Sequence, residues 1–231
     1  MKRKLVYLFA IIFMASSCAP SLVAPEITKN DVYGEMYKES PQTILVLLPI
    51  NKTGNVEAKE FFYATLTTTL SDRGYYIMPP FISQEILRRE SANDSEQFVD
   101  SSLKLFGDVF GADAIFFTII HDWKKDGVTS KVEVTVEYIL KSAKTNQVLF
   151  HRKGNLIYDT TIKAGKNASL TTMILASIAS KVNTVATSYV SVARMCNDAS
   201  LLDMPAGKYN ANHKIDSAFA AGKKEFSTTI K

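Results

Sequence analysis

The side chains best suited to catalysis or metal binding in this 231-residue chain are three histidines, His121, His151 and His213. No two of them have a metal-ligand spacing such as i, i+4, and neither a CxxC nor an HExxH pattern occurs. The sequence also contains no glycine-rich phosphate loop and no GxSxG elbow. We therefore predict a protein that is not an enzyme and that uses no metal or other cofactor.

Two short stretches stand at the carboxyl ends of predicted strands, where open sheets place their ligands. His121 follows the most apolar run after the N-terminal segment, residues 114–120, and Asn51 and Thr53 follow the run at 43–48. These three residues are the candidates for a ligand-binding loop. The alternative is that His121 leads into a hairpin turn and that the loop at Asn51 caps the next helix.

The N-terminal residues have the composition of a signal peptide. Three basic residues at positions 2–4 precede an apolar stretch at 5–15. At about 1.5 Å per residue, a helix of that length spans only about half of a ~30 Å hydrocarbon core. We predict that residues 1–17 are a cleaved signal peptide rather than a membrane anchor.

Cys18 directly follows the small residues Ala15, Ser16 and Ser17. This arrangement resembles the lipobox of bacterial lipoproteins, although leucine is usual where Ala15 stands. The resemblance implies that Cys18 carries the lipid, palmitate included, and becomes the new N-terminus. The alternative is an ordinary secretory signal in which Cys18 has no role.

Lipidation would make the membrane the first partner of the protein. Each buried methylene contributes about 0.8 kcal/mol, so two or three acyl chains give nearly permanent anchoring. No aspartate follows Cys18. By the rule known for enterobacterial lipoproteins, this implies the outer membrane, with the protein facing the periplasm.

Charge and cysteine content exclude two further classes of protein. Removal of residues 1–17 takes away three positive charges and lowers the formal net charge from +4 to +1, so no nucleic-acid partner is expected. With Cys18 acylated, Cys196 has no partner within the chain, which excludes a disulfide fold. Cys196 is predicted to be a small buried thiol, with an intermolecular or reactive role as the alternative.

Apolar periodicity predicts strands and helices in alternation from residue 43 onward. The continuous run at 43–48 indicates a strand covered on both faces. The predicted elements are strands at 43–48, 75–78 and 114–120, a helix with the stripe Phe62, Leu66 and Leu70, a short helix at 83–90, and a helix that begins near Asp94 or Ser95 with the stripe Val99, Leu103, Phe106 and Phe110.

The pattern changes after a turn signal at Asp126 and Gly127. Apolar residues at 132, 134, 136, 138 and 140 alternate with polar ones, and a further strand covers 148–158, so the two form an antiparallel hairpin. We predict an α/β fold with a mixed sheet, in which strand, helix, strand, helix and strand precede the hairpin and a long C-terminal helix. The predicted boundaries are a lipidated tether at 18–40, a single domain at 41–205 and a poorly ordered tail at 206–231.

Residues 167–193 carry a single charge, Lys181, but are too rich in Ser, Thr and Asn for a lipid-facing span. The first interpretation is a long helix packed over the sheet. The alternative is a helix that faces a partner or is associated with a pore. Because short hydroxyl side chains permit close approach, we predict that Ser177, Thr184 and Ser188 contact a partner, in a homo-oligomer or a heteromeric complex.

Five short sequences occur in an informative order: LLPINKT at 47–53, GYYIMP at 74–79, FGADA at 110–114, KTNQVL at 144–149 and LDMPAG at 202–207. Together they resemble the bacterial lipoprotein family typified by a neisserial vaccine-candidate antigen. The core of that family is similar to the N-terminal domain of the Tol-system periplasmic protein and to the curli-secretion lipoprotein. The family has no assigned catalytic residues, and its genes tend to lie beside that of a curli-secretion-like lipoprotein, which is therefore a candidate partner.

The first functional hypothesis is a non-enzymatic lipoprotein that acts as a subunit of an envelope assembly or secretion/transport complex. The second is a periplasmic module that binds a small ligand or a glycan for a transporter, and a hydrolase is a distant third. An exposed apolar surface would favour the first hypothesis, whereas a deep polar cleft near Asn51 or His121 would favour the others.

Overall fold

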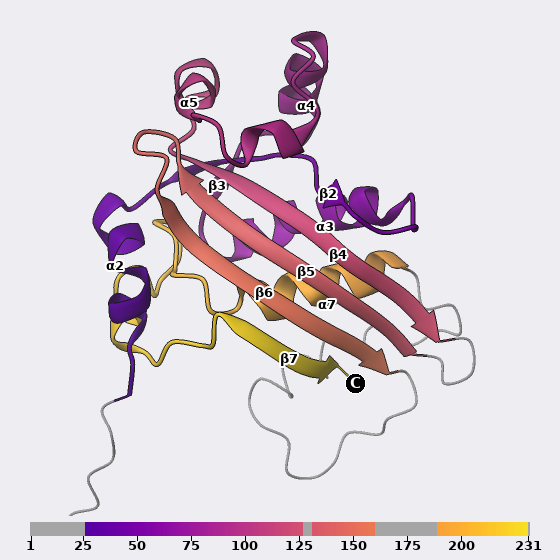
Figure 1. Cartoon of the computed structure of the whole chain (residues 1–231). Helices are drawn as coiled ribbons and strands as arrows, with labels where there is room; N and C mark the ends of the chain where they lie inside the picture. Colours follow the sequence, from indigo (N-terminus) through magenta and orange to yellow (C-terminus); the bar gives the residue numbers. More distant parts are fainter. Residues whose placement is uncertain (1–25, 127–130, 160–188, 231) are drawn as a thin grey trace, which may run out of the picture.

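The computed structural model of the chain describes residues 26–126, 131–159 and 189–230. Seven described strands form one mixed sheet in the order β3-β1-β4-β5-β6-β7, with β2 paired to β4 beside this path (Figure 1). The strands are β1 Thr43–Val46, β2 Ile50–Asn51, β3 Tyr76–Ile77, β4 Ala114–Asp126, β5 Lys131–Ser142, β6 Val148–Asp159 and β7 Glu225–Ile230. The helices are α2 Lys29–Glu39, α3 Ala58–Asp72, α4 Pro80–Arg89, α5 Lys104–Phe110 and α7 Tyr189–Leu201, and the 3-10 helices are η1 Ser95–Phe98 and η2 Ile215–Ala218.

Parallel and antiparallel pairs divide the sheet into three regions. The short strands β1, β2 and β3 pair in parallel with β4 or with each other. The long strands β4, β5 and β6 form an antiparallel meander, and β7 adds to β6 in parallel. The predicted α/β fold with a mixed sheet and an antiparallel hairpin is therefore confirmed.

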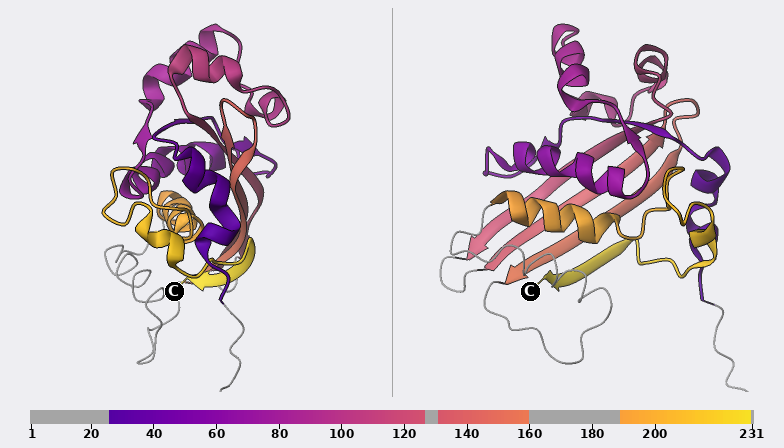
Figure 2. Two further views of the ribbon diagram at one scale, coloured as in Figure 1. Left: turned by 90° about the vertical axis from the view of Figure 1, so that its left-hand side faces the viewer. Right: turned by 180° about the vertical axis from the view of Figure 1, so that it is seen from behind.

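Helices α3 and α7 cover one face of the sheet, here called the inner face (Figure 2, right). The alternating residues of β5 explain this packing, because Val134, Val136 and Tyr138 are fully buried against the helices. The predicted stripe of α3 lies in the same core. Cys196 of α7 is a buried free thiol with 1 % exposure, as expected.

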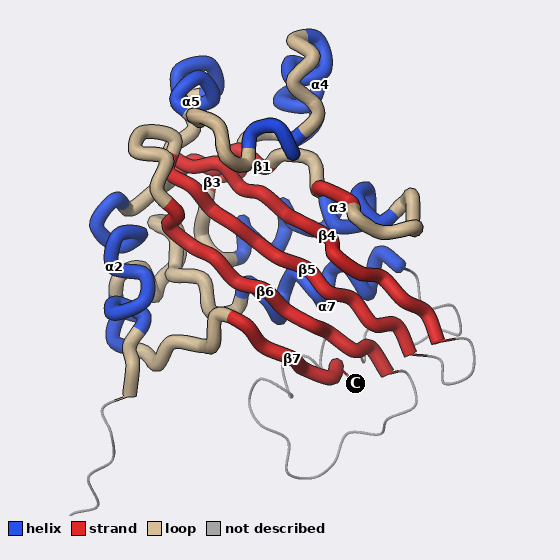
Figure 3. Tube along the Cα trace, in the orientation of Figure 1, coloured by secondary structure: helices blue, strands red, loops and turns tan. Residues whose placement is uncertain are grey.

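A second, smaller core lies on the outer face of the sheet, at the end where β4 begins. Leu45 of β1 and Leu47, which follows β1, pack there with Phe117 of β4, Leu87 of α4 and Phe106 of α5. Since Ile44 and Val46 belong to the inner core, the run at 43–48 is covered on both faces as predicted. Figure 3 shows no described element over the outer face of β4, β5 and β6 beyond this core.

The predicted tether at 18–40 is wrong in its second half, because residues 29–39 form α2. Thr28 and Asp31 make a capping box that starts the helix. Tyr33 and Met36 are 4 % and 2 % exposed and pack in the inner core. Helix α2 therefore belongs to the domain.

The predicted tail at 206–231 is also incorrect for its described residues. Phe226, Thr228 and Ile230 alternate along β7, which pairs with β6. A β-bridge joins Thr28 to Ala220, and the Lys29 amide donates to the Phe219 carbonyl at 2.8 Å. The C-terminal segment thus completes the sheet and holds the start of α2.

Two predicted helices have different bounds. The helix with the stripe from Val99 to Phe110 is broken into η1 and α5, and Ser101 Oγ donates to the Gln97 carbonyl at 2.7 Å in the turn between them. The last helix continues past residue 193 to Leu201, whereas residues 160–188 lie outside the described part of the chain. Within the described residues, no helix has the length and apolarity to cross a membrane.

Candidate functional site

In the predicted ligand loop, the side chain of Asn51 forms hydrogen bonds with other residues of the same loop. Asn51 Oδ1 accepts from the Thr53 amide at 3.0 Å and from Thr53 Oγ1 at 2.8 Å, while Asn51 Nδ2 donates to the Asn55 carbonyl at 2.7 Å. Helix α3 begins with Glu57 at its N-cap and has no side-chain cap. The loop therefore stabilises a turn, and the alternative that it caps the helix is wrong.

His121 lies within a strand rather than in a turn, because β4 continues to Asp126. Its strand passes beside the first loop, where Asn51 pairs with Ile120. The ladder between β4 and β5 is irregular between Ile120 and Asp122, so His121 occupies a bulge. Trp123 returns to the inner core, with its ring 5.7 Å from that of Phe62.

Glu137 of β5 joins His121 to His151 of β6 on the outer face of the sheet. Its two carboxylate oxygens lie 2.6 Å from His121 Nε2 and 2.6 Å from His151 Nε2. The direct cross-strand neighbours of Glu137 are Ile119 on β4 and Lys153 on β6. His121 and His151 each lie two residues from these neighbours, in the diagonal position. We call these three residues the outer cluster.

The outer cluster is half-buried, and its carboxylate is stabilised in the charged form. Burial alone would raise the pKa of Glu137, but the hydrogen bonds from His121 and His151 outweigh it and lower that pKa. The side chains of the two histidines are 28 % and 29 % exposed. Both Nε2 atoms face the carboxylate, and the described residues contain no group of three ligands arranged to hold a metal ion.

A hollow of about 390 Å³ opens on the other side of the sheet, away from both predicted loops. Arg152 of β6, Lys29 of α2 and Asp203 supply its charged groups. The remaining lining residues are mostly apolar or small: Ala199, Leu202, Phe219, Ala220, Ala221, Gly222, Phe226 and Thr228. The charged and apolar groups together suit a small amphipathic molecule.

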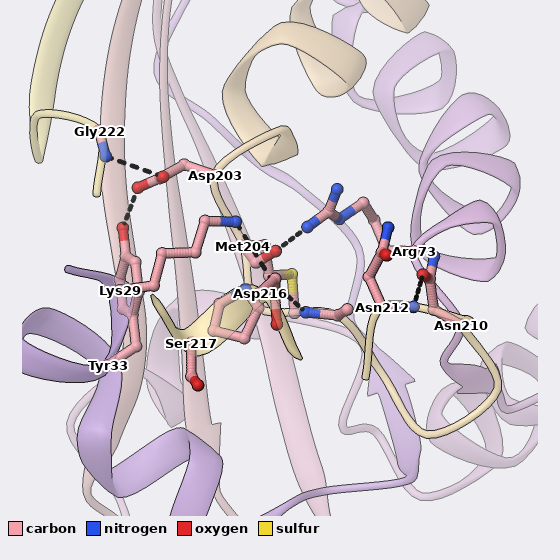
Figure 4. A network of polar contacts seen from close by, with 12 residues as sticks. Lys29, Tyr33, Arg73, Asp203, Met204, Asn210, Asn212, Asp216, Ser217 and Gly222 are labelled. Atoms are coloured by element: carbon pink, nitrogen blue, oxygen red, sulfur yellow. Dashed lines mark hydrogen bonds and ion pairs between the residues drawn. The ribbon is translucent and has the colours of Figure 1, made fainter. Parts of the chain in front are cut away.

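A network of polar contacts surrounds the hollow and ties the C-terminal segment to the domain (Figure 4). Asp203 accepts from the Tyr33 hydroxyl at 2.6 Å and from the Gly222 amide at 2.8 Å. Asp216 forms an ion pair with Lys29 at 3.4 Å and accepts from the Ala206 amide at 2.9 Å. We call this set, with Arg152, the inner network.

Helices α4 and α5 expose large apolar side chains. Phe81 and Ile82 of α4 are 85 % and 58 % exposed, and Leu105 and Val109 of α5 are 69 % and 57 % exposed. Leu105 and Val109 are four residues apart and therefore share one side of their helix. We call this surface the apolar end of the molecule.

Several predicted site residues lie outside the described part of the chain. These are the lipidation site Cys18 and the predicted contact residues Ser177, Thr184 and Ser188. Sequence reasoning singled out His121 but not its partners Glu137 and His151, nor Arg152 and Lys29 at the hollow. For Arg152 a signal existed, because it falls in phase with Phe150 and Leu156 on the buried face of β6.

The sequence matches the family model described as "Putative lipoprotein GNA1162-like" over residues 31–208. It is 23 % identical over 155 residues to the "Putative lipoprotein NMB1124/NMB1162" of Neisseria meningitidis serogroup B, an alignment that covers 66 % of this chain and 69 % of that protein. These matches confirm the family resemblance that the five ordered motifs indicate.

Solved structures give weaker matches. Lipoprotein GNA1162 from Neisseria meningitidis is 18 % identical with a TM-score of 0.49, covering 62 % of this chain and 98 % of that one. A PelC dodecamer from Paraburkholderia phytofirmans is 14 % identical with a TM-score of 0.42, covering 71 % and 87 %. The LpoB C-terminal domain from Salmonella enterica is 13 % identical with a TM-score of 0.40, covering 55 % and 94 %. With TM-scores below 0.5, these likenesses support no functional conclusion.

Proposed function

Because the chain belongs to the GNA1162-like lipoprotein family, we propose that it is a non-enzymatic subunit of an envelope assembly or secretion/transport complex. Family membership implies a lipid-anchored protein of the cell envelope. The proposal adds that the lipid is attached to Cys18, that the protein faces the periplasm from the outer membrane, and that it works by contact with other envelope proteins.

The observation that carries the proposal is the apolar end formed by α4 and α5. Four large apolar side chains of these helices, Phe81, Ile82, Leu105 and Val109, are more than half exposed. Leaving such side chains in water is unfavourable by about 25 cal/mol per Å², and exposed apolar surface on neighbouring helices is typical of a contact surface. This is the kind of surface that favours the first hypothesis.

The geometry of the chain favours a protein rather than the anchoring membrane as the occupant of the apolar end. Cys18 precedes the first described residue, Glu26, by eight positions, which span about 30 Å at most. Figures 1 and 2 show α4 and α5 at the opposite end of the molecule from the start of the described chain before α2. The apolar end therefore lies on the far side of the domain from the segment that leads to Cys18.

Introduction of negative charges at apolar positions tests the contact surface. Leu105→Glu combined with Val109→Glu should change the free energy of unfolding by about 0.5 kcal/mol or less, since both side chains are exposed. Crosslinking in intact cells, followed by affinity purification from detergent-solubilised membranes, should recover envelope proteins with the wild type and at least tenfold less with the double variant. The matched control is Val56→Glu, because Val56 is 79 % exposed in the loop before α3. Equal recovery with the wild type and the double variant would remove the basis of the proposal.

Anchoring is tested separately by Cys18→Ala. The variant should remain unprocessed or become soluble in the periplasm, because it lacks the thiol that accepts the lipid. Membrane fractionation with immunodetection measures this. A variant that still sediments with the outer membrane like the wild type would contradict lipidation at Cys18.

The hollow beside Arg152 favours a second candidate function, the binding of a small ligand. It lies far along the sheet from the predicted loops, so its residues rather than Asn51, Thr53 or His121 carry this alternative.

A further inference from the structure

We propose that the hollow bordered by α2, the end of α7 and β7 binds an amphipathic anion, in which a phosphate or carboxylate group is attached to an apolar body. This inference goes beyond the proposed function, because a contact subunit requires no such ligand. It rests on the bonding of Arg152, the distribution of charge around it and the shape of the hollow.

Arg152 is a buried cation whose guanidinium is only partly used. Its Nε donates to the Lys223 carbonyl at 3.2 Å, and its Nη1 donates to the Ser200 carbonyl at 2.8 Å. The guanidinium carbon lies 4.1 Å from the centre of the Phe226 ring. Among the described residues, Nη2 has no acceptor within hydrogen-bond distance and no carboxylate lies within 4.0 Å of the side chain. Nη2 is therefore available to a ligand.

Counted with the neighbouring Arg73, the cations of the inner network outnumber its carboxylates by three to two. Lys29 and Arg152 are 6 % and 8 % exposed, and Arg73 lies close enough to Lys29 to lower its pKa, after the larger effect of burial. The facing carboxylates are Asp203 and Asp216. Asp216 pairs with Lys29, and both oxygens of Asp203 accept from other donors. Asp203 is near enough to favour the charged form of Arg152, but it forms no ion pair with it.

An external anion would complete this set of charges. A buried charge without a partner is costly, and a guanidinium binds phosphate or carboxylate through strong charge-assisted hydrogen bonds. Lys223, Lys224 and Glu225, which follow Gly222 in the chain, are exposed, so this segment adds one net positive charge next to the hollow in the sequence. The described charges thus favour an anion over a cation or a neutral ligand.

The shape of the hollow leaves room at the guanidinium. A Cβ atom at Gly222 would lie 2.9 Å from Arg152 Nη2 and 3.0 Å from the Asp203 carboxyl carbon, so a side chain there would close the space beside Nη2. The other walls, with Leu202, Phe219 and Phe226, are apolar. A volume of about 390 Å³ is that of a small-molecule site and exceeds the size of a single inorganic ion. These walls account for the apolar body of the ligand.

Two sources supply this chemistry: an anionic membrane lipid and a soluble organic anion. The first test measures the melting temperature of the full chain purified in a neutral detergent. The probes are dihexanoylphosphatidylglycerol, sodium octanoate and inorganic phosphate, with octyl glucoside as a neutral amphiphile.

At about 100 times its dissociation constant, a ligand should raise the melting temperature by about 5 °C. A shift with phosphatidylglycerol but not with octanoate identifies the lipid source, and a shift with octanoate identifies the soluble source. A shift with inorganic phosphate as large as that with either amphiphile contradicts the apolar body of the ligand. No shift with any anion, or an equal shift with octyl glucoside, overturns the proposal.

The second test places a carboxylate in the hollow. Thr228 lines the hollow from β7, whereas Thr229 points to the other side of the same strand and is exposed. Thr228→Glu should weaken anion binding at least tenfold, because the new carboxylate would pair with the Arg152 guanidinium. The control Thr229→Glu should bind the anion like the wild type. If Thr228→Glu fails to fold, Leu202→Glu carries the same test, because Leu202 also lines the hollow and is 39 % exposed. Wild-type affinity in a folded variant with glutamate at either position overturns the proposal.

Discussion

His151 and Arg152 are consecutive residues of β6, and they belong to different charged clusters on opposite faces of the sheet. His151 lies in the outer cluster, where one carboxylate serves two half-exposed imidazoles. Arg152 lies in the inner network, where it is 8 % exposed and donates to backbone carbonyls at the end of α7 and before β7. The two clusters therefore have different partners. Members of the outer cluster contact side chains of the same meander, whereas Arg152 of the inner network contacts the backbone of other elements.

This difference separates a cluster that water can reach from one that fixes the fold. The two imidazoles of the outer cluster are 28 % and 29 % exposed, so water can solvate its polar groups when a partner is removed. The inner network has no comparable access to water, so the loss of one member leaves buried groups without partners. Substitutions on the two faces of the same strands can measure the difference.

The largest effect is expected for Arg152→Met. The carbonyl groups of Ala199, Ser200 and Lys223 would lose their donor, which should lower the free energy of unfolding by about 3 kcal/mol. The matched control is Lys153→Met, because Lys153 is the next residue of β6 and faces the outer side. Chemical denaturation followed by circular dichroism measures both variants. Equal stability of the two variants would show that the faces do not differ in this way.

A smaller effect is expected for Glu137→Gln. The amide oxygen can accept from only one of the two imidazoles, so the variant should lose about 1 kcal/mol at pH 7. Glu133→Gln on the same strand is the control, because Glu133 Oε1 accepts from Asn155 Nδ2 at 2.9 Å and an amide oxygen can replace it. If Glu137→Gln lowered the free energy of unfolding by more than about 3 kcal/mol, the outer cluster would contribute as much to stability as the inner network.

The smallest effect is a change in pH dependence. Because the pKa of Glu137 in the folded protein is below its ordinary value of 4.5, its contribution to stability is complete above pH 4.5 and is lost as the pH falls through the folded pKa. Among the described residues, the titratable groups that face it are His121 from β4 and His151 and Lys153 from β6. The difference in melting temperature between the wild type and Glu137→Gln should shrink between pH 4.5 and pH 3. A constant difference over that range would contradict this assignment.

The sequence predicts most of the sheet because the central strands have strong local patterns. The run at 114–120 is apolar enough to require burial on both faces, and the alternation in β5 specifies which side faces the helices. By contrast, α2 buries little beyond Tyr33 and Met36. Its main stabilisation comes from residues near the other end of the chain, which local periodicity does not reveal.

The C-terminal strand was predictable from a weak signal. Glu225, Ser227 and Thr229 alternate with Phe226, Thr228 and Ile230, which is a period of two. Of the three inward side chains only Ile230 is aliphatic, and the flanking residues include several lysines. The composition therefore indicated a tail. Pairing with β6 is what turns this segment into a strand.

The charged clusters depend on register, and register is set by contacts between strands. His121 stood out because it follows an apolar run, but its position opposite Glu137 requires the irregular pairing at Ile120 and Asp122. The position of His151 requires the turn between β5 and β6, where the register also shifts at Leu140 and Lys141. A shift of one residue in either ladder would move these side chains to opposite faces.

The β-bridge between Thr28 and Ala220 has a consequence for the order in which the chain folds. Its two partners lie near opposite ends of the sequence, and contacts of such high sequence separation form slowly. Synthesis proceeds from the N-terminus, so residues 26–39 emerge long before Phe219 and Ala220 are available. The meander of β4, β5 and β6 can form from neighbouring residues, whereas α2 acquires its final backbone partner only when the chain is nearly complete. A chain truncated before residue 219 would therefore lose β7 and, at the same time, the backbone partners of Thr28 and Lys29 at the start of the first helix.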